Sequence, residues 1–269
     1  MPDAPQPDQL DEAILLRDDT DAGITTVTLN RPAKRNALSD AMLAALKSTL
    51  DAIDGDPAAR VVILAANGPV FSAGHDLKEM RADPSYDNIL RLFTDCSEVM
   101  LTLTRMRQPV IARVHGTAAA AGCQLVAACD LAVASEDARF ATPGIVNGLF
   151  CSTPMVPLSR TVGRKAAMEM LLTGNLIDAE RALRFGLVNR VVPADRLDEA
   201  VMEFAERIAG LSTKSMSMGK EAFYRQIDMD LDEAYAFTSK VMAENMQVHD
   251  AREGIDAFLE KRRPEWQDR

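Results

Sequence analysis

The first two thirds of the chain alternate short apolar runs with amphipathic stretches. The apolar runs predict strands, and those runs cover residues 13–16, 24–29, 61–66, 110–114 and 131–134. Ser39 is a predicted helix N-cap, because apolar residues follow it at helical spacing from Met42 to Ile53. Further helices are predicted near 86–106 and 121–129. Strands that alternate with helices in this way predict the α/β class.

The pattern changes near Pro154, after which helical periods dominate. One short strand is predicted at 188–192, and helices are predicted at 162–173, 178–185, 197–211, 214–226, 231–246 and 251–261. We expect three segments, namely a flexible acidic lead at 1–12, a sheet-bearing core at 13–200 and a C-terminal helical region at 201–269.

Composition narrows the classes of function. The 269 residues include 30 Lys and Arg against 40 Asp and Glu, so the formal charge is −10. This balance argues against nucleic-acid binding, which needs a clustered basic face. With only three His, a histidine-rich metal centre is also disfavoured, and we expect no metal and no cofactor.

Cysteine usage and the N-terminus predict a location. Cys96, Cys123, Cys129 and Cys151 form no C-x-x-C pair, and a chain of this size does not need disulfides, so we expect thiols in a reducing cytoplasm. The acidic N-terminus lacks the features of a signal or transit peptide. No apolar run reaches the roughly 18 residues of a membrane helix. These features predict a soluble, cytoplasmic protein without a membrane partner.

Two glycine-containing turns follow predicted strands and lead toward helices. The first is the run Phe71–Met80, and the second is the run Gly116–Gln124. In such turns the backbone N–H groups that begin a helix have no intrahelical partner and can bind a polarised carbonyl oxygen. The alternative is that both turns serve only tight packing between helix and strand.

Several motifs, taken in order, resemble those of the enoyl-CoA hydratase/isomerase (crotonase) superfamily, and the resemblance extends from about residue 13 to 264. The pattern is similar to the subgroup described as enoyl-CoA hydratase domain-containing proteins. The motifs are Asn30–Pro32, Asn36–Leu38, Phe71–Met80, Gly122–Leu125, Cys129–Ala132, Phe140–Pro143, Leu171–Gly174, Ala179–Ala182, Gly186–Val188 and Phe258–Arg262.

The resemblance implies a fold, an assembly and a ligand. It implies a spiral of ββα units with a C-terminal helical trimerisation region, assembled as a homotrimer or hexamer, and an acyl-CoA thioester as ligand in fatty acid metabolism. It places the two oxyanion-hole N–H donors at His75 and Ala121. The His75 imidazole is either a base or substrate contact, or a side chain turned away from the thioester.

The same resemblance assigns residues to coenzyme A. It points to Lys34, Arg35, Ala37 and Leu38, and to Asp76 and Leu77, around the adenine and pantetheine. It matches Phe258 and Lys261 to tail residues that reach the nucleotide of a neighbouring subunit. Without the resemblance, the basic residues among these would be interpreted as plain solvated charges.

The sequence departs from the hydratase pattern at both catalytic glutamates. Gln124 stands at the first position and Gly144 at the second. Neither side chain can exchange a proton at neutral pH, so both carboxylates of ordinary hydration are missing. Ordinary hydration is therefore not expected.

Other residues offer weaker chemistry near the second position. Ser152 falls near where some isomerases of the family carry an acid, but a serine alone is a poor base. Cys151 is either a nucleophile with a lowered pKa or a buried inert thiol. Three acidic residues after the first turn could be brought inward, or could be ordinary surface charges, and they are Glu79, Asp87 and Asp95.

Three functions remain open. The leading hypothesis is an acyl-CoA-processing enzyme of the hydratase/isomerase family, of the lyase or isomerase class. The second is a protein that binds or sequesters acyl-CoA without turnover. The third is a thioesterase-like or decarboxylase-like variant that uses the same oxyanion hole.

Overall fold

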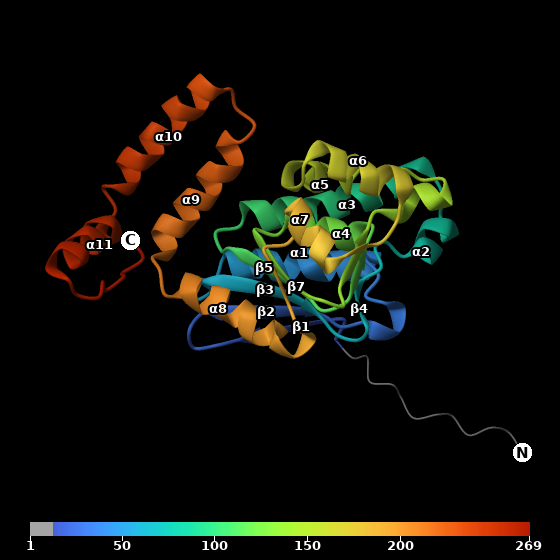
Figure 1. The fold of residues 1–269 in the computed structure, drawn as a ribbon, viewed down its shortest axis with the longest axis horizontal. Helices are drawn as coiled ribbons and strands as arrows, with labels where there is room; N and C mark the ends of the chain where they lie inside the picture. Colours follow the sequence, from blue (N-terminus) through green and yellow to red (C-terminus); the bar gives the residue numbers. More distant parts are fainter. Residues whose placement is uncertain (1–12) are drawn as a thin grey trace, which may run out of the picture.

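A computed structural model describes residues 13–269, and Figure 1 shows its two sheets with helices packed around them. The larger sheet has six strands in the order β1-β2-β3-β5-β7-β10. Its strands are β1 (Leu15–Asp19), β2 (Ile24–Leu29), β3 (Val61–Ala66), β5 (Val110–Val114), β7 (Leu131–Ser135) and β10 (Arg190–Val192). All neighbours in it are parallel except β1 and β2, which form an antiparallel hairpin.

The smaller sheet contains four very short strands in the order β4-β6-β8-β9. They are β4 (Val70–Ser72), β6 (Thr117–Ala119), β8 (Arg139–Ala141) and β9 (Ile177–Asp178). Strands β3, β5 and β7 of the large sheet are each followed by a strand of the small sheet and then by helix. The chain therefore winds as successive ββα turns, and the α/β class is confirmed.

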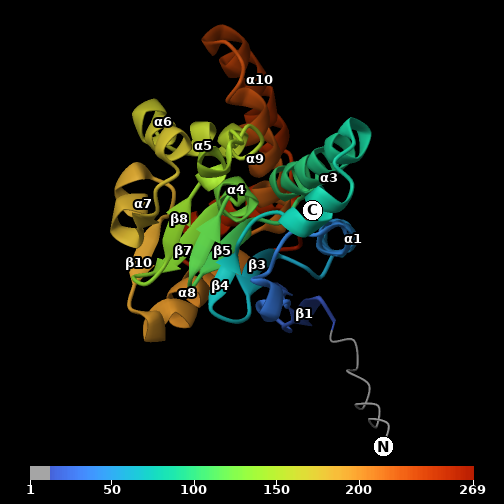
Figure 2. The same cartoon turned by 90° about the vertical axis from the view of Figure 1, so that its right-hand side faces the viewer.

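Helices cover both faces of the larger sheet (Figures 1 and 2). One layer contains α1 (Asp40–Asp54), α2 (Leu77–Ala82), α3 (Tyr86–Arg105), α4 (Ala121–Ala128), α5 (Met155–Thr161), α6 (Arg164–Thr173) and α7 (Ala179–Phe185). The other face is covered by α8 (Leu197–Ala209). Because β3 is buried on both faces, Val62 and Leu64 join the main core while Val61 and Ile63 pack toward α8.

Local signals account for several helix boundaries. The Ser39 Oγ accepts a hydrogen bond from Met42 N at 3.2 Å, which confirms the predicted cap of α1. Asp178 caps α7, and Gly186 ends it with a φ of +83°. These caps act through neighbouring residues only, which is why the sequence pattern locates them.

The structure corrects three predicted elements. The first strand covers 15–19 rather than 13–16, because its pairing with β2 carries it through charged residues up to the turn at Thr20. The helix predicted at 162–173 begins at Arg164, and a separate α5 precedes it. The strand predicted at 188–192 is paired only from Arg190.

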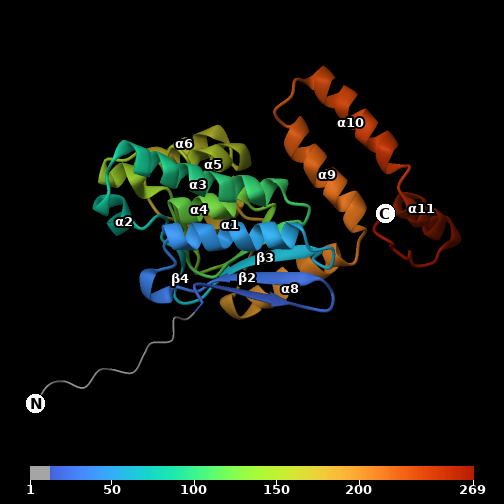
Figure 3. The same ribbon diagram turned by 180° about the vertical axis from the view of Figure 1, so that it is seen from behind.

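The last helices form an arm that projects from the body (Figures 1 and 3). It consists of α9 (Thr213–Gln226), α10 (Leu231–Asn245) and α11 (His249–Glu260). The expected boundary at residue 200 lies inside α8, whose residues Ala200 and Val201 are buried against the sheet. The division into core and helical region stays a prediction, and the lead at 1–12 lies outside the described residues.

Candidate functional site

The two glycine-containing turns meet at one place. Gly74 has a φ of +89°, and a Cβ on it would lie 2.8 Å from Ala120 Cβ and 3.1 Å from Ala121 N. A side chain at this position would therefore separate the two turns. Gly74 is required both for its backbone conformation and for this close approach.

Helix α4, which follows the second turn, packs directly against the first turn. Gly122 lies so close to β4 that a Cβ on it would be 2.3 Å from Ser72 O. Ala120, which precedes α4, has a φ of +50° although it is not glycine, and its N–H donates to Ala141 O at 2.9 Å. A strained backbone held by its surroundings is a feature found at functional sites.

Two backbone donors remain free where the turns meet. Among the residues that the structure describes, neither His75 N nor Ala121 N donates a hydrogen bond. Ala121 is the first residue of α4, so its N–H has no intrahelical partner. Two unpaired donors on touching turns can stabilise one negatively charged oxygen.

The His75 side chain is held inside the protein. Its Nδ1 lies 3.3 Å from Leu38 O, its ring packs edge-on against Phe93 at 5.2 Å, and its Nε2 is buried without a partner in the described part of the chain. Burial lowers the pKa of His75, and the contact with Leu38 O and the charge of Asp40 offset this only in part. The imidazole is therefore neutral at neutral pH.

Gln124 projects from the first turn of α4 into a buried environment. Only 3% of the residue is exposed, and its Oε1 has no partner within residues 13–269. The hydroxyl of Thr142, after β8, is also buried and unpartnered. Thr142 is the residue that sequence reasoning missed, although it lies in the Phe140–Pro143 motif, because a single threonine carries no signal of its own.

Gly144, which the resemblance matches to the second glutamate, has no room for a side chain. A Cβ on Gly144 would lie 2.5 Å from Leu149 O and 2.8 Å from Cys151 Sγ. The Gly144 N–H donates to Cys151 Sγ at 3.2 Å, so the thiol occupies the space next to the glycine. No side chain enters at this position unless the loop from 144 to 151 moves.

The two nearby nucleophile candidates show no activation. Burial raises the pKa of Cys151, which favours the neutral thiol at neutral pH. The Ser152 side chain is exposed, and its Oγ lies 3.4 Å from Phe150 O. Cys151 thus lies beside Gly144, and Ser152 follows it in the chain. Neither side chain has a contact within residues 13–269 that would activate it as a nucleophile.

The segment from Lys34 to Leu38 is bonded to the first turn. The buried Asn36 side chain donates to Asn67 O and Val70 O, both at 2.9 Å, and Ala73 N donates to Arg35 O. Leu38 N donates to Gly74 O at 2.8 Å. The residues expected to bind coenzyme A in this segment therefore lie beside the two glycine-containing turns.

The other residues assigned to coenzyme A divide into two groups. Asp76 caps α2 by accepting from Lys78 N, and Leu77 beside it is exposed, so both stay near the first turn. Phe258 and Lys261 lie on and after α11, and Phe258 is 82% exposed. Helix α11 lies at the opposite end of the folded molecule from α2, so one subunit alone does not bring all of these residues together (Figures 1 and 3).

The acidic residues after the first turn have other contacts. Glu79 accepts from Asp40 N at 2.9 Å, and Asp95 forms an ion pair with Arg91 at 2.9 Å. Asp87 is an exposed residue in the first turn of α3. None of these contacts directs a carboxylate toward His75 or Ala121.

Residues 13–269 contain neither a metal-binding cluster nor a membrane-spanning helix. No cluster of three or more His, Cys, Asp or Glu side chains is arranged to hold a metal ion there. In the same residues, no helix has both the length and the apolar character needed to cross a membrane.

Comparison with known proteins defines the class. The family model described as enoyl-CoA hydratase/isomerase matches residues 19–269. The chain therefore belongs to the enoyl-CoA hydratase/isomerase family, and its crotonase-like α/β fold is confirmed. The trimerisation role of the helical region stays a prediction.

Individual relatives place the chain within that family. It is 51% identical over 246 residues to human enoyl-CoA hydratase domain-containing protein 3, mitochondrial, with 91% of this chain and 80% of that protein covered. The human protein's crystal structure superposes with a TM-score of 0.92, at 48% identity over 94% of this chain and all of that one. A structure described as enoyl-CoA hydratase from Mycobacterium smegmatis has a TM-score of 0.93 and 55% identity, covering 95% and 99% of the two chains. The expected subgroup is thus confirmed.

The same comparison corrects the expected location. The relatives from human, rat and mouse are all named mitochondrial proteins. The prediction of a cytoplasmic location is therefore wrong by this comparison. It rested on thiol chemistry and on the N-terminal composition, and reduced thiols are not specific to the cytoplasm.

Proposed function

We propose that the chain is an enzyme acting on acyl-CoA thioesters, and that the N–H groups of His75 and Ala121 polarise the thioester carbonyl. The observation that carries this proposal is the pair of unbonded donors on touching turns, held together by Gly74. A single oxyanion-hole donor contributes about 3–4 kcal/mol to the transition state in studied enzymes. Family membership supports the acyl-CoA class of substrate.

The proposal assigns the nucleotide end of the ligand to basic residues on the neighbouring loop. Lys34 and Arg35 are exposed, and the Arg35 carbonyl accepts a hydrogen bond from Ala73 N in the first turn. Charged side chains beside a phosphate form strong hydrogen bonds. The adenine and pantetheine would then be surrounded by Ala37, Leu38, Asp76 and Leu77. The proposed activity requires no separate cofactor.

The reaction we propose is not ordinary hydration. Hydration of an enoyl thioester needs a base to activate water and an acid to protonate the α-carbon. Gln124 cannot titrate, and the space at Gly144 is taken by Leu149 O and Cys151 Sγ. We infer that polarisation of the carbonyl is kept in this chain while the two-carboxylate step is lost.

An assay with crotonyl-CoA and longer enoyl-CoAs tests this directly. We expect acyl-CoA to bind in calorimetry, and we expect loss of the enoyl absorbance to stay at background. Rapid hydration would contradict the assignment of Gln124 and Gly144. Absence of any acyl-CoA binding would contradict the whole proposal.

Ala121→Pro removes one donor at the first residue of α4, where the N–H has no intrahelical partner. We expect it to weaken acyl-CoA binding and to reduce any turnover by about 10²–10³-fold. Arg164→Pro, at the exposed first residue of α6, where the preceding Gly163 has a ψ of 147°, is the matched control and should change neither quantity.

A second function is binding of acyl-CoA without turnover. It is favoured because Gln124, Gly144 and the neutral Cys151 thiol supply no general base. Product analysis by mass spectrometry separates the two. Unchanged acyl-CoA supports sequestration, whereas free coenzyme A or a shortened acyl-CoA identifies hydrolysis or decarboxylation through the same oxyanion hole.

We further propose that the chain assembles as a homotrimer or hexamer through its arm. The arm exposes large apolar side chains on all three helices, among them Phe223, Tyr235, Met242, Phe258 and Leu259. Exposed apolar surface of this extent is typical of an interaction site. In such an assembly Phe258 and Lys261 of one subunit would reach the ligand of its neighbour.

A further inference from the structure

Helix α11 packs loosely against the rest of its subunit. Within the described chain, only two of its 12 residues are buried, namely Asp250 and Ala257. An open, mainly apolar groove of about 620 Å³ lies between α11 and the start of α9. A helix with so little buried surface needs other contacts to hold its position, because most helical stability in proteins comes from tertiary packing.

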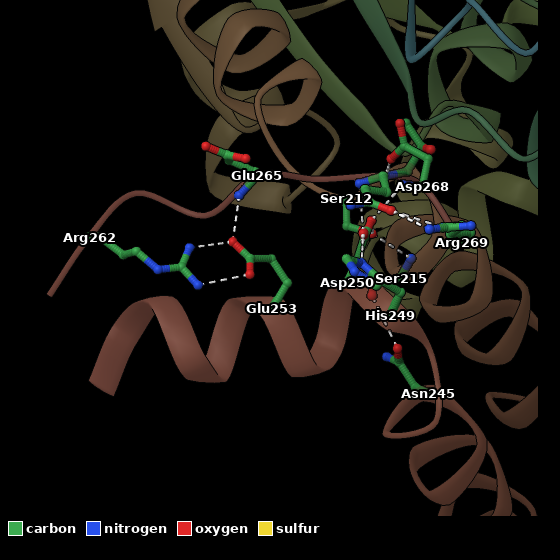
Figure 4. Close-up of polar contacts among 12 residues, drawn as sticks. Ser212, Ser215, Asn245, His249, Asp250, Glu253, Arg262, Glu265, Asp268 and Arg269 are labelled. Atoms are coloured by element: carbon green, nitrogen blue, oxygen red, sulfur yellow. Dashed lines mark hydrogen bonds and ion pairs between the residues drawn. The ribbon is translucent and has the colours of Figure 1, made fainter. Parts of the chain in front are cut away.

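Residues 264–269, which follow α11, provide such contacts, and we call them the clamp segment. Glu265 N donates to the Glu253 carboxylate in the middle of α11 at 2.8 Å. The chain then runs back toward the first turn of α11, where Figure 4 shows Asp268 close to Asp250. The clamp segment therefore folds back along the helix that it follows.

A buried acid at the start of α11 holds the clamp segment in place. Asp250 is only 1% exposed, and it accepts from Gln267 N at 2.8 Å, from Asp268 N at 2.9 Å and from the Ser212 hydroxyl at 2.6 Å. Burial by itself would raise the pKa of Asp250, but these hydrogen bonds outweigh it and lower the pKa. The carboxylate is thus ionised at neutral pH and joins α11, the clamp segment and the N-cap of α9.

Trp266 of the clamp segment joins α11 to the end of α8. Its indole Nε1 donates at 2.9 Å to the carbonyl of Gly210, the C-cap of α8. Its ring packs against Gly254 of α11, where an added Cβ would lie 3.1 Å from the ring atom Cη2. Because α8 covers one face of the large sheet, this contact connects α11 to the body.

Asp268 of the clamp segment bridges a gap between the body and the arm. The gap is a cavity of about 220 Å³, and its lining includes Arg107 from the body and Lys214 from the arm. Asp268 Oδ2 accepts from Arg60 Nη1, just before β3, at 2.7 Å, and Asp268 Oδ1 accepts from Thr213 N at the start of α9 at 2.8 Å. One carboxylate therefore links two parts of the subunit across space that they do not fill themselves.

We propose that the clamp segment positions α11, and with it Phe258 and Lys261, for binding of the ligand's nucleotide. This inference rests on the proposed function, in which these two residues reach the ligand of the neighbouring subunit. Phe258 lies one helical turn after Gly254, which contacts Trp266, so a shift of the helix moves Phe258 as well. Trp266 and Asp268 are positioning residues, since they act on the ligand only through α11.

Calorimetry with two ligands tests this role. Octanoyl-CoA contains the nucleotide, whereas the octanoyl thioester of pantetheine lacks it and keeps the thioester. Trp266→Ala combined with Asp268→Ala, the clamp variant, should bind octanoyl-CoA about tenfold more weakly than wild type does. Its affinity for octanoyl-pantetheine should be unchanged. A general loss of folded structure would weaken both ligands, so the difference between them identifies positioning.

Two further variants complete the experiment. Trp266→Phe combined with Asp268→Glu keeps a ring and a carboxylate, and it should recover most of the affinity for octanoyl-CoA. Arg269→Ala is the matched control in the same segment, because its exposed side chain bonds only to Gln267 Oε1 within residues 13–269. It should bind both ligands as wild type does. Equal octanoyl-CoA affinity in wild type and the clamp variant would overturn the positioning role.

Hydrogen exchange without ligand separates the clamp from the proposed function. Amides of α11 should exchange faster in the clamp variant than in wild type, whereas those of α4 in the core should be unchanged. Unchanged protection of α11 would overturn the clamp, whatever the ligand results are. If α11 loses protection as expected but wild type binds neither ligand, the proposed function fails, and with it the role of the clamp in nucleotide binding.

Discussion

His75 combines two roles at the residue scale, because its backbone and its side chain act independently. The N–H belongs to the proposed oxyanion hole, and the imidazole fills a buried space between Leu38 O and Phe93. A substitution that keeps a ring of similar size leaves the backbone N–H in place and removes only the titratable imidazole. That separation makes the residue suitable for a pH experiment.

The lowered pKa of His75 predicts how stability depends on pH. Unfolding restores the ordinary pKa of about 6.5, so below that pH the unfolded chain binds more protons than the folded one. The free energy of unfolding should therefore fall as the pH decreases from 7.5 to 5.5. His75→Phe should show a smaller fall, measured by urea unfolding at both pH values.

Some of the fall should persist in His75→Phe, because burial also lowers the pKa of His115. Equal pH dependence in wild type and variant would show that His75 is not buried as a neutral group. Acyl-CoA binding by His75→Phe should be retained, since the proposed donor is the backbone N–H.

At the scale of elements, a glycine allows α4 to pack directly against β4. Gly122 stands where a side chain would collide with the backbone of Ser72, whereas Gly219 in α9 has no atom within 4 Å of a Cβ position. Both glycines are helical, Gly122 as the second residue of α4 and Gly219 in the middle of α9, so alanine suits the helix at each position. Comparing them isolates the cost of the close contact.

Gly219→Ala should stabilise the protein by about 0.5–1 kcal/mol through helix propensity and reduced entropy of the unfolded chain. Gly122→Ala should destabilise it by about 1–3 kcal/mol, because the backbone oxygen 2.3 Å from the new Cβ must move. Urea unfolding measures both. A stabilising effect of Gly122→Ala would contradict the close contact between Gly122 and Ser72 in the two glycine-containing turns.

At the scale of the whole molecule, one buried ion pair attaches the arm to the body. Lys220 on α9 donates to Asp130 Oδ2 at 2.7 Å and to the carbonyls of Leu103 and Gln108. Asp130 also accepts from Tyr224 and from Val110 N. The side chains of Lys220 and Asp130 are 6% and 17% exposed, so neither charge is well solvated if its partner is lost.

Asp130→Ala should destabilise the protein by about 3–5 kcal/mol, because it leaves the Lys220 ammonium buried without its counter-ion. Lys220→Met combined with Asp130→Asn should cost less than the sum of the single substitutions, since both buried charges are removed. A double-mutant cycle in urea measures the coupling. Strict additivity would show that the pair does not interact.

The exposed arm predicts self-association on the same scale. Tyr235→Glu and Phe258→Glu place charges on apolar positions that are 67% and 82% exposed. Each should shift the mass found by analytical ultracentrifugation from trimer or hexamer toward monomer. Asp232→Glu, on the first turn of α10, is a control without added charge. An unchanged mass in both variants would exclude the arm as the interface.

Local signals in the sequence predict much of the fold and part of the site. The alternation of apolar runs predicts β2, β3 and β5 with their observed bounds, and the cap at Ser39 predicts the start of α1. The short strands of the second sheet were not predicted, because two or three residues are too few to show a period. The glycines in the sequence indicate the two glycine-containing turns, but the contact between these turns at Gly74 and Ala120 is not a local property.

The amino-acid sequence is sufficient to predict the α/β class, the family resemblance and the absence of glutamate at positions 124 and 144. Each of these depends on residue identity or on spacing between neighbours. Three features follow from tertiary packing alone: Cys151 fills the space beside Gly144, Thr142 is buried without a partner within residues 13–269, and Arg107 and Lys214 line one cavity. These facts depend on segments far apart in the chain, and packing alone brings such segments together.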